Sequence, residues 1–445
     1  MHQEPPRRIL PSIVVSQFFC TSLWFAGNAV LGDIIQEYGL HGNMLADLTS
    51  CVQSGFITGT LFFALFSIAD RFSPSRVFFI CAIIAAVFNL GMLIRGLSPA
   101  MLLLFRFFTG FFLAGIYPVG MKIAADHFQK GLGKSLGFLV GALVLGTAFP
   151  HFIKTITAGL PWRYVIWSIS ILSVAGGFIM MLLVPDGLHR KAASGFRLMA
   201  FTTAFHNPKF RSAAFGYFGH MWELYTFWAF VPVMLAANNE QHHSGLNIPL
   251  LSFIIIAGGS IACASGGIWS ARFGAKKIAT VALFVSCCCC LLSPLFIVSS
   301  SAAVVTGFLF VWGLAVIADS PMFSTLVAQN VKEELKGTAL TIVNCIGFSI
   351  TILSIQFIKQ RPQFAELRFA DVAVLIRIKF AEQSTAKTSH RPFHLGWSKA
   401  CRFLSLSPAH GSPFFHPLTH FLGSLQKLLF RQRFIGAFVQ GFVNP

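Results

Sequence analysis

The chain has 445 residues, of which 55% are hydrophobic and only 11% are charged. A water-soluble domain averages about 25% charged residues, so the composition excludes an ordinary soluble protein and indicates that lipid is the solvent. The formal net charge is +18. Because most basic residues of the apolar part sit in loops between the spans and form no continuous face for phosphates, we expect no nucleic-acid partner.

Eleven apolar stretches follow one another along the chain. Each is about 19 to 25 residues long, which matches about 30 Å of hydrocarbon at about 1.5 Å per residue. Lipid-exposed backbone must satisfy its own hydrogen bonds, so the pattern predicts an all-α membrane protein. The expected spans are residues 9–31, 47–69, 77–95, 100–124, 135–157, 164–184, 212–236, 248–270, 278–298, 302–325 and 338–358.

Lys and Arg concentrate in the loops on one side of the expected spans, beginning with Arg7 and Arg8. Cytoplasmic loops carry such an excess, so we expect a cytoplasmic N-terminus. We expect the membrane to be a bacterial inner (plasma) membrane. Arg7 and Arg8 before an apolar run also resemble a signal peptide. The run continues to Leu31 and ten more spans follow it, so we interpret it as a retained first helix.

The longest loop of the helical part, residues 185–211, is basic and divides the spans into two sets. An Arg-Phe pair ends the second span of each set, at Arg71 and at Arg272. Repeated sets of helices are a transporter architecture. We therefore expect a six-helix N-terminal half (1–184), a cytoplasmic central loop (185–211), a five-helix C-terminal half (212–358) and an atypical basic tail (359–445).

The loops that follow these Arg-Phe pairs resemble a signature of the major facilitator superfamily, roughly G-x-x-x-D-R-x-G-R-R/K. The first copy keeps the acidic and basic residues but lacks both glycines, and Ala271 replaces the Asp in the second copy. Residues 106–110 resemble the family's second signature, an Arg followed four residues later by Gly. The resemblance covers residues 9–358. It implies a two-half bundle with an inner-gate latch, plain topogenic charge being the alternative; the latch residues would be Asp70, Arg71, Arg76 and Arg272.

The resemblance also implies that helices 1, 4, 7 and 10 line a central cavity, and these helices carry the buried polar residues. A charge at the centre of a membrane helix costs about 2.5–3.5 kcal/mol or more, so such a residue is a functional candidate. Arg106 offers a planar fork for an anionic substrate, unless it reaches the surface or binds a carbonyl. Trp24 and Asn28 could complete this substrate site, with interior packing as the alternative.

Three further residues are candidates for proton coupling. Glu223 lies near the middle of helix 7, and His220 lies one turn earlier on the same face. Asp319 precedes Pro321, which predicts a broken helix 10 at this point and a pairing with Arg106 across an empty cavity. A buried polar contact with a neighbouring helix is the alternative role for Glu223 and for Asp319.

These features predict a proton-coupled symporter of a small anion or metabolite that works by alternating access. We expect a monomer without a cofactor or a metal, whose partners are the bilayer, a small-molecule substrate and protons. Drug or multidrug efflux is an alternative, favoured by an aromatic cavity and a cationic substrate; a non-transporting or decayed membrane protein is another. The chain has no nucleotide-binding motif and no nucleophile–base set, so we expect no enzyme.

Residues 359–445 contain no expected span, although a complete family member has twelve helices. We expect that the original sequence ends near residue 358 and that the remainder comes from a shifted frame or a fused segment. The alternative is a genuine basic tail that lies on anionic lipid. A missing twelfth helix would expose polar helix faces to lipid, which predicts weak transport and poor stability.

Overall fold

Helices form the whole of the secondary structure in the part of the chain that the structure, a computed structural model, describes. The described residues are 6–39, 44–128, 132–187, 204–299, 301–332 and 335–359. All of them belong to one unit, Met1–Gln383. The predicted all-α membrane fold is confirmed. The expectations for the tail fall on residues outside the described ranges, apart from Lys359.

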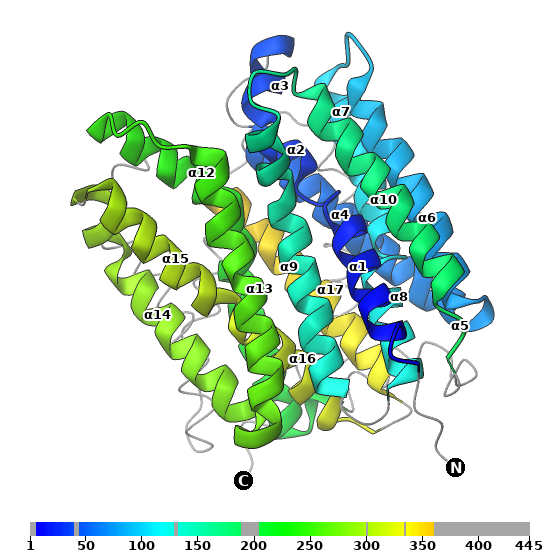
Figure 1. Ribbon diagram of the computed structural model, residues 1–445. Helices are drawn as coiled ribbons and strands as arrows, with labels where there is room; N and C mark the ends of the chain where they lie inside the picture. Colours follow the sequence, from blue (N-terminus) through cyan, green and yellow to red (C-terminus); the bar gives the residue numbers. More distant parts are fainter. Residues whose placement is uncertain are drawn as a thin grey trace, which may run out of the picture. The chain divides into compact units, whose positions relative to one another are not determined.

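Eight helices run without interruption (Figure 1): α4 (Met44–Leu65), α6 (Pro74–Leu90), α9 (Leu132–Ile156), α10 (Arg163–Leu183), α12 (Pro208–His242), α13 (Ile248–Phe273), α14 (Ala275–Ser299) and α17 (Lys336–Lys359). Three expected spans are divided instead: the first into α1 (Ile9–Thr21), α2 (Ala26–Ala29) and α3 (Leu31–Tyr38), the fourth into α7 (Pro99–Leu113) and α8 (Tyr117–His127), and the tenth into α15 (Ala302–Ala318) and α16 (Ser320–Gln329). The short α5 (Ile68–Arg71) and the 3₁₀ turn η1 (Gly91–Leu93) complete the set.

Within the described residues, nine helices are long and apolar enough to cross a membrane. The expected first span is represented by the shorter apolar helix α1, which α2 and α3 continue. The seventh is represented by α12, a 35-residue helix that carries His220, Glu223 and an internal Pro232. Each of the eleven expected spans therefore corresponds to a helix or to a divided helix.

The helix breaks have local causes in the sequence. Thr21 and Ser22 donate their hydroxyls to the carbonyls of Gln17 and Phe19, at 2.8 and 2.6 Å, and such bonds compete with the backbone ladder as α1 ends. A Pro lies in the first turn of both α8 and α16, where it cannot continue the preceding helix. The tenth expected span is therefore broken at Asp319, between α15 and α16, as the spacing of Asp319 from Pro321 predicts.

Glycines let pairs of helices approach closely. A Cβ on Gly110 of α7 would lie 1.9 Å from the carbonyl oxygen of Val52 on α4, and one on Gly55 would lie 1.9 Å from that of Phe107. A Cβ on Gly137 of α9 would lie 3.1 Å from the Cα of Gly267 on α13. Small residues at helix crossings allow this backbone packing in lipid. The α4–α7 and α9–α13 contacts therefore fix the helices that carry the site.

We expect Gly110→Ala to destabilise the protein by about 1–3 kcal/mol, because the new methyl group overpacks the backbone of α4. The thermal unfolding midpoint of the purified protein in detergent would show this loss. Gly307→Ala is the matched control, because Gly307 lies exposed in α15 and its Cβ would meet nothing within 4 Å. Equal midpoints for the two variants would contradict the close packing of α4 and α7.

Candidate functional site

Arg106 of α7 is fully buried and closes the break in the first helix. Its Nη2 donates to the backbone carbonyls of Leu23 and Trp24, at 3.1 and 2.6 Å. Its Nη1 donates to Oδ1 of Asn89 at 3.1 Å, and Asn89 is oriented by its own bond to Ser170. Binding to backbone carbonyls is one of the alternatives to anion binding that the sequence analysis gave for Arg106.

The charge of Arg106 is not neutralised by any ion pair within the described residues. Its three acceptors are neutral oxygens, and its Nε has no hydrogen-bond partner among the residues that the structure describes. Nε lies 3.4 Å from the position that a Cβ on Gly27 would occupy, so a larger residue there would press on the guanidinium. A buried charge without a counter-ion is costly, so Arg106 remains a candidate functional residue.

Trp24 belongs to a set of buried aromatic side chains that we call the central aromatic cluster, and each member is at most 3% exposed. The Trp24 ring lies 4.8 Å from Phe56 of α4, 5.7 Å from Tyr225 of α12 and 5.5 Å from Phe348 of α17. The cluster therefore joins helices from both parts of the sequence. Its members are Trp24, Phe25, Phe56, Tyr225, Trp228 and Phe348.

The second substrate candidate on the first helix, Asn28, is partly buried beside α4. Its Nδ2 donates to Oγ1 of Thr49 at 2.8 Å, and its Oδ1 has no partner within the described chain. Gln53 of α4 is fully buried, and both of its amide atoms are without partners there. A single Gln in an apolar run gives no sign in the sequence of what surrounds it.

The structure brings His220 and Asp319 together at the break between α15 and α16. Nδ1 of His220 lies 2.7 Å from Oδ1 of Asp319, and both side chains are at most 2% exposed. The backbone carbonyl of Asp319 accepts from the amides of Met322 and Phe323, which anchors the start of α16. The two atoms are within ion-pair distance, although neither makes a hydrogen bond within the described residues.

Glu223 faces a different set of neighbours, although it lies one turn from His220. Its Oε1 accepts from Oγ of Ser286 at 2.6 Å and from Nε1 of Trp312 at 2.6 Å. The thiol of Cys290 lies 3.0 Å from the same oxygen. The Glu223 carboxylate is therefore directed toward α14 and α15, and Cys290 has a polar contact that a run of four cysteines does not reveal.

The pairing of Arg106 with Asp319 that the sequence suggested is not present. Arg106 binds the first helix and Asn89, whereas Asp319 lies against His220. The two side chains belong to helices that have other neighbours: α7 packs on α4 and α6, and α16 packs on α12, α14 and α17. Arg106 and the His220–Asp319 pair are therefore separate centres.

At the end of the bundle where α1 begins, Asp70 finds a partner that the sequence did not identify. Nζ of Lys122, on α8, lies 2.9 Å from Asp70 and 3.4 Å from Asp126. Arg71 and Arg76 are exposed. The guanidinium of Arg272 lies 5.4 Å from the ring centroid of Phe273. Lys122 is thus a further candidate for the inner-gate loop. Only its contact with Asp70 of α5 identifies it, because the sequence alone does not show this contact.

The opposite end, where α3 lies in Figure 1, carries two further contacts. Lys154 of α9 lies 2.5 Å from Asp33 of α3. Glu37 accepts from Nε1 of Trp162 at 2.6 Å and pairs with Arg163. The hydrogen bond from Trp162, together with Arg163, holds the pKa of Glu37 below its ordinary value. These contacts attach α3 to the end of α9 and the start of α10.

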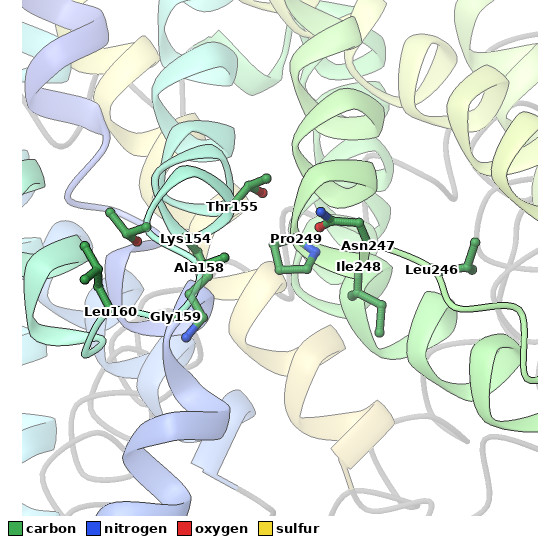
Figure 2. A pocket seen from close by; sticks show the side chains of 10 residues that line it. Lys154, Thr155, Ala158, Gly159, Leu160, Leu246, Asn247, Ile248 and Pro249 are labelled. Atoms are coloured by element: carbon green, nitrogen blue, oxygen red, sulfur yellow. The ribbon is translucent and has the colours of Figure 1, made fainter.

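A pocket of about 390 Å³ lies between the end of α9 and the start of α13. Figure 2 shows residues 154–160 on one side of it and residues 246–249 on the other. None of the expected substrate-binding or proton-coupling residues lines this pocket. It is therefore distinct from the candidate site around Arg106, the central aromatic cluster and Asp319.

Comparisons with known proteins give one family model and solved structures of the same fold. The family model described as Major Facilitator Superfamily matches residues 13–355. A single-residue mutant of the nucleoside transporter NupG superposes with a TM-score of 0.64 at 15% identity, over 84% of this chain and 99% of that one. The human organic anion transporter MFSD10 (TETRAN) superposes with a TM-score of 0.67 at 14% identity, over 86% and 100%. No curated protein matches the sequence.

Proposed function

The chain belongs to the major facilitator superfamily, so it is an integral membrane transporter of the secondary type and not an enzyme, and we propose that it carries a small organic anion together with protons. One observation supports this proposal above the others. Two broken helices each meet a buried ionisable side chain: the first helix meets Arg106, and the tenth contains Asp319. Broken helices with such residues are a recurrent feature of transporter binding sites.

The positive charge of Arg106 is the reason to propose an anion. Neutral carbonyl and amide oxygens satisfy most of its donors, but they leave the charge itself uncompensated in a fully buried position. An anionic group near Nε would supply both the missing acceptor and the counter-charge. Trp24 and Asn28 lie on the same segment and complete the proposed substrate-binding set.

His220 and Asp319 are the proposed proton carrier, because Nδ1 of His220 lies 2.7 Å from Oδ1 of Asp319 and both side chains are buried. Glu223 would serve as a second acid on the same helix, held by Ser286 and Trp312. Protonation of this pair would remove a buried negative charge from the α15–α16 joint. Such a change in charge can bias a packed bundle between two arrangements.

Alternating access would arise from rocking of two halves, residues 1–184 and 212–358, joined by the loop 185–211. The crossings α9–α13 and α4–α17 connect these parts and would act as the moving surfaces. Asp70, Arg71, Arg76 and Arg272, with Lys122, would form the inner gate. We place the N-terminus in the cytoplasm of a bacterial inner membrane and propose a monomer as the working unit.

The two solved neighbours are described as transporters of a nucleoside and of organic anions. The second description agrees with an anionic substrate, although the likeness itself concerns the fold. Efflux of cationic drugs is the second candidate, and the central aromatic cluster favours it because aromatic faces attract cations. The sign of the substrate charge therefore separates the two proposals.

The test uses the full chain in proteoliposomes with a matched pair of permanently charged probes. Benzenesulfonate and benzyltrimethylammonium carry the same ring and opposite charges. We expect saturable benzenesulfonate uptake that increases when the external side is acidified, with alkalinisation of that side reported by a pH-sensitive dye. Uptake of benzyltrimethylammonium alone would favour the efflux alternative. Benzenesulfonate uptake that does not change with the pH gradient would contradict proton coupling.

A further inference from the structure

The central aromatic cluster contains polar atoms that have no partner. Nε1 of Trp24, Nε1 of Trp228 and the hydroxyl of Tyr225 are buried and make no hydrogen bond within the described residues. The side chains that carry them are each 1% exposed. Buried Trp and Tyr usually find a partner for these groups, and leaving one unpaired costs about 1–3 kcal/mol.

A fourth unpartnered group lies beside the cluster. Gln53 is one turn before Phe56 on α4, so both side chains share a face of that helix. Its amide oxygen and nitrogen are buried without partners in the described part of the chain. The unpaired groups therefore include two N–H donors and a hydroxyl on rings that lie 4.6 to 6.3 Å from one another, and a complete amide one helical turn from the Phe56 ring.

The cluster is also divided between the two sides of the carrier. Trp24, Phe25 and Phe56 come from the first helix and α4, whereas Tyr225, Trp228 and Phe348 come from α12 and α17. The rings contact each other directly: Phe348 stacks on Trp24 at 26°, and Trp228 meets Phe25 edge-on at 84°. When the two sides separate during transport, these ring-to-ring contacts can be replaced by contacts to a planar molecule.

We propose that the central aromatic cluster is a binding subsite for a planar heteroaromatic ring whose edge carries hydrogen-bond acceptors. The rings supply stacking faces at the spacing that aromatic pairs prefer. Trp24, Trp228 and Tyr225 supply donors to the ring edge, and Gln53 supplies both a donor and an acceptor. Because the backbone carbonyl of Trp24 is bound by Arg106, the ring would lie next to that charge. This proposal rests on the proposed anion transport and narrows its substrate to heteroaromatic anions.

Three sulfonates of equal charge and similar size separate the parts of this proposal. Pyridine-3-sulfonate has a planar ring with an acceptor nitrogen, benzenesulfonate has a planar ring without one, and cyclohexanesulfonate has neither. Binding to the purified full chain is measured by quenching of tryptophan fluorescence and by calorimetry. We expect affinity to fall in that order, by about tenfold from the first probe to the last.

Tyr225→Phe is the matched variant, because it keeps the ring and removes only the hydroxyl; Trp228→Phe is a second variant, which keeps a benzene ring and removes the N–H together with the five-membered ring of the indole. We expect each variant to weaken pyridine-3-sulfonate about three- to tenfold and to leave cyclohexanesulfonate unchanged. An unchanged elution volume in size-exclusion chromatography verifies the fold of each variant. If Tyr225→Phe fails this check, Trp228→Phe is used in its place.

Equal affinity for the three sulfonates, or equal effects of the variants on all three, would overturn the subsite. If the three sulfonates still bind in that case and benzyltrimethylammonium does not, the proposed anion transport stands and only the subsite is lost. Binding of none of the sulfonates would overturn the subsite as well. Preference for the cation over all three would instead overturn the proposed function.

Discussion

Asp319→Asn is expected to abolish proton-driven accumulation while it preserves exchange of the substrate across the membrane. An amide cannot take up a proton as the carboxyl 2.7 Å from His220 would in the proposed function, so substrate movement would no longer be tied to proton movement. With one proton per anion, a gradient of about two pH units supports about 100-fold accumulation. We expect that ratio to fall to about one in the variant, measured with labelled benzenesulfonate in proteoliposomes.

The control for this experiment is Asp33→Asn. It makes the same chemical change in a carboxylate that pairs with Lys154 near the surface, away from the proposed proton carrier. Counterflow with equal pH on both sides shows whether the Asp319 variant still binds and exchanges the probe. Full accumulation by Asp319→Asn, or loss of accumulation by both variants, would show that this carboxyl is not the coupling group.

Arg106→Gln is expected to have the second large effect, on both affinity and stability. It removes the one buried positive charge that we assign to the substrate, so we expect anion affinity to fall by about 100-fold or more. It also removes the donors to the carbonyls of Leu23 and Trp24, which costs about 1–3 kcal/mol for each group left unpaired. Calorimetric titration and thermal unfolding in detergent measure the two losses.

Arg106→Lys separates charge from geometry, because lysine keeps the charge without the planar fork. We expect it to retain part of the anion affinity while it loses the contact to Asn89 or to the first helix. Arg163→Gln is the surface control, since Arg163 is partly exposed and pairs with Glu37. Anion affinity that is unchanged in Arg106→Gln would remove this residue from the substrate site.

The membrane fold follows from the sequence because hydrophobic length and loop charge are local properties. The break at Asp319 could also be predicted, since Pro321 determines it through backbone geometry alone. The partners of Arg106 could not, because they depend on the packing of α7 against a break more than 80 residues away along the chain. A residue pattern within a single span does not reveal contacts between residues so far apart in the sequence.

The same limit applies to the acidic residues. Helical spacing correctly places Glu223 and His220 on neighbouring parts of α12, but it does not determine which helix each one meets. Glu223 reaches α14 through Ser286 and Cys290, and Asp70 reaches α8 through Lys122. Cys290 and Lys122 lie in runs that the sequence describes only as apolar or basic. Their roles depend on the tertiary arrangement.

The separation of Arg106 from the His220–Asp319 pair has a thermodynamic consequence. Because neither centre contacts the other, in the proposed function the anion and the proton would affect each other's binding through the electrostatic field or by redistributing the carrier among its conformations. Linkage then requires reciprocity: the factor by which protonation changes anion affinity equals the factor by which the anion changes proton affinity. A titration of anion affinity against pH would therefore report how strongly anion binding changes the proton affinity of the His220–Asp319 pair.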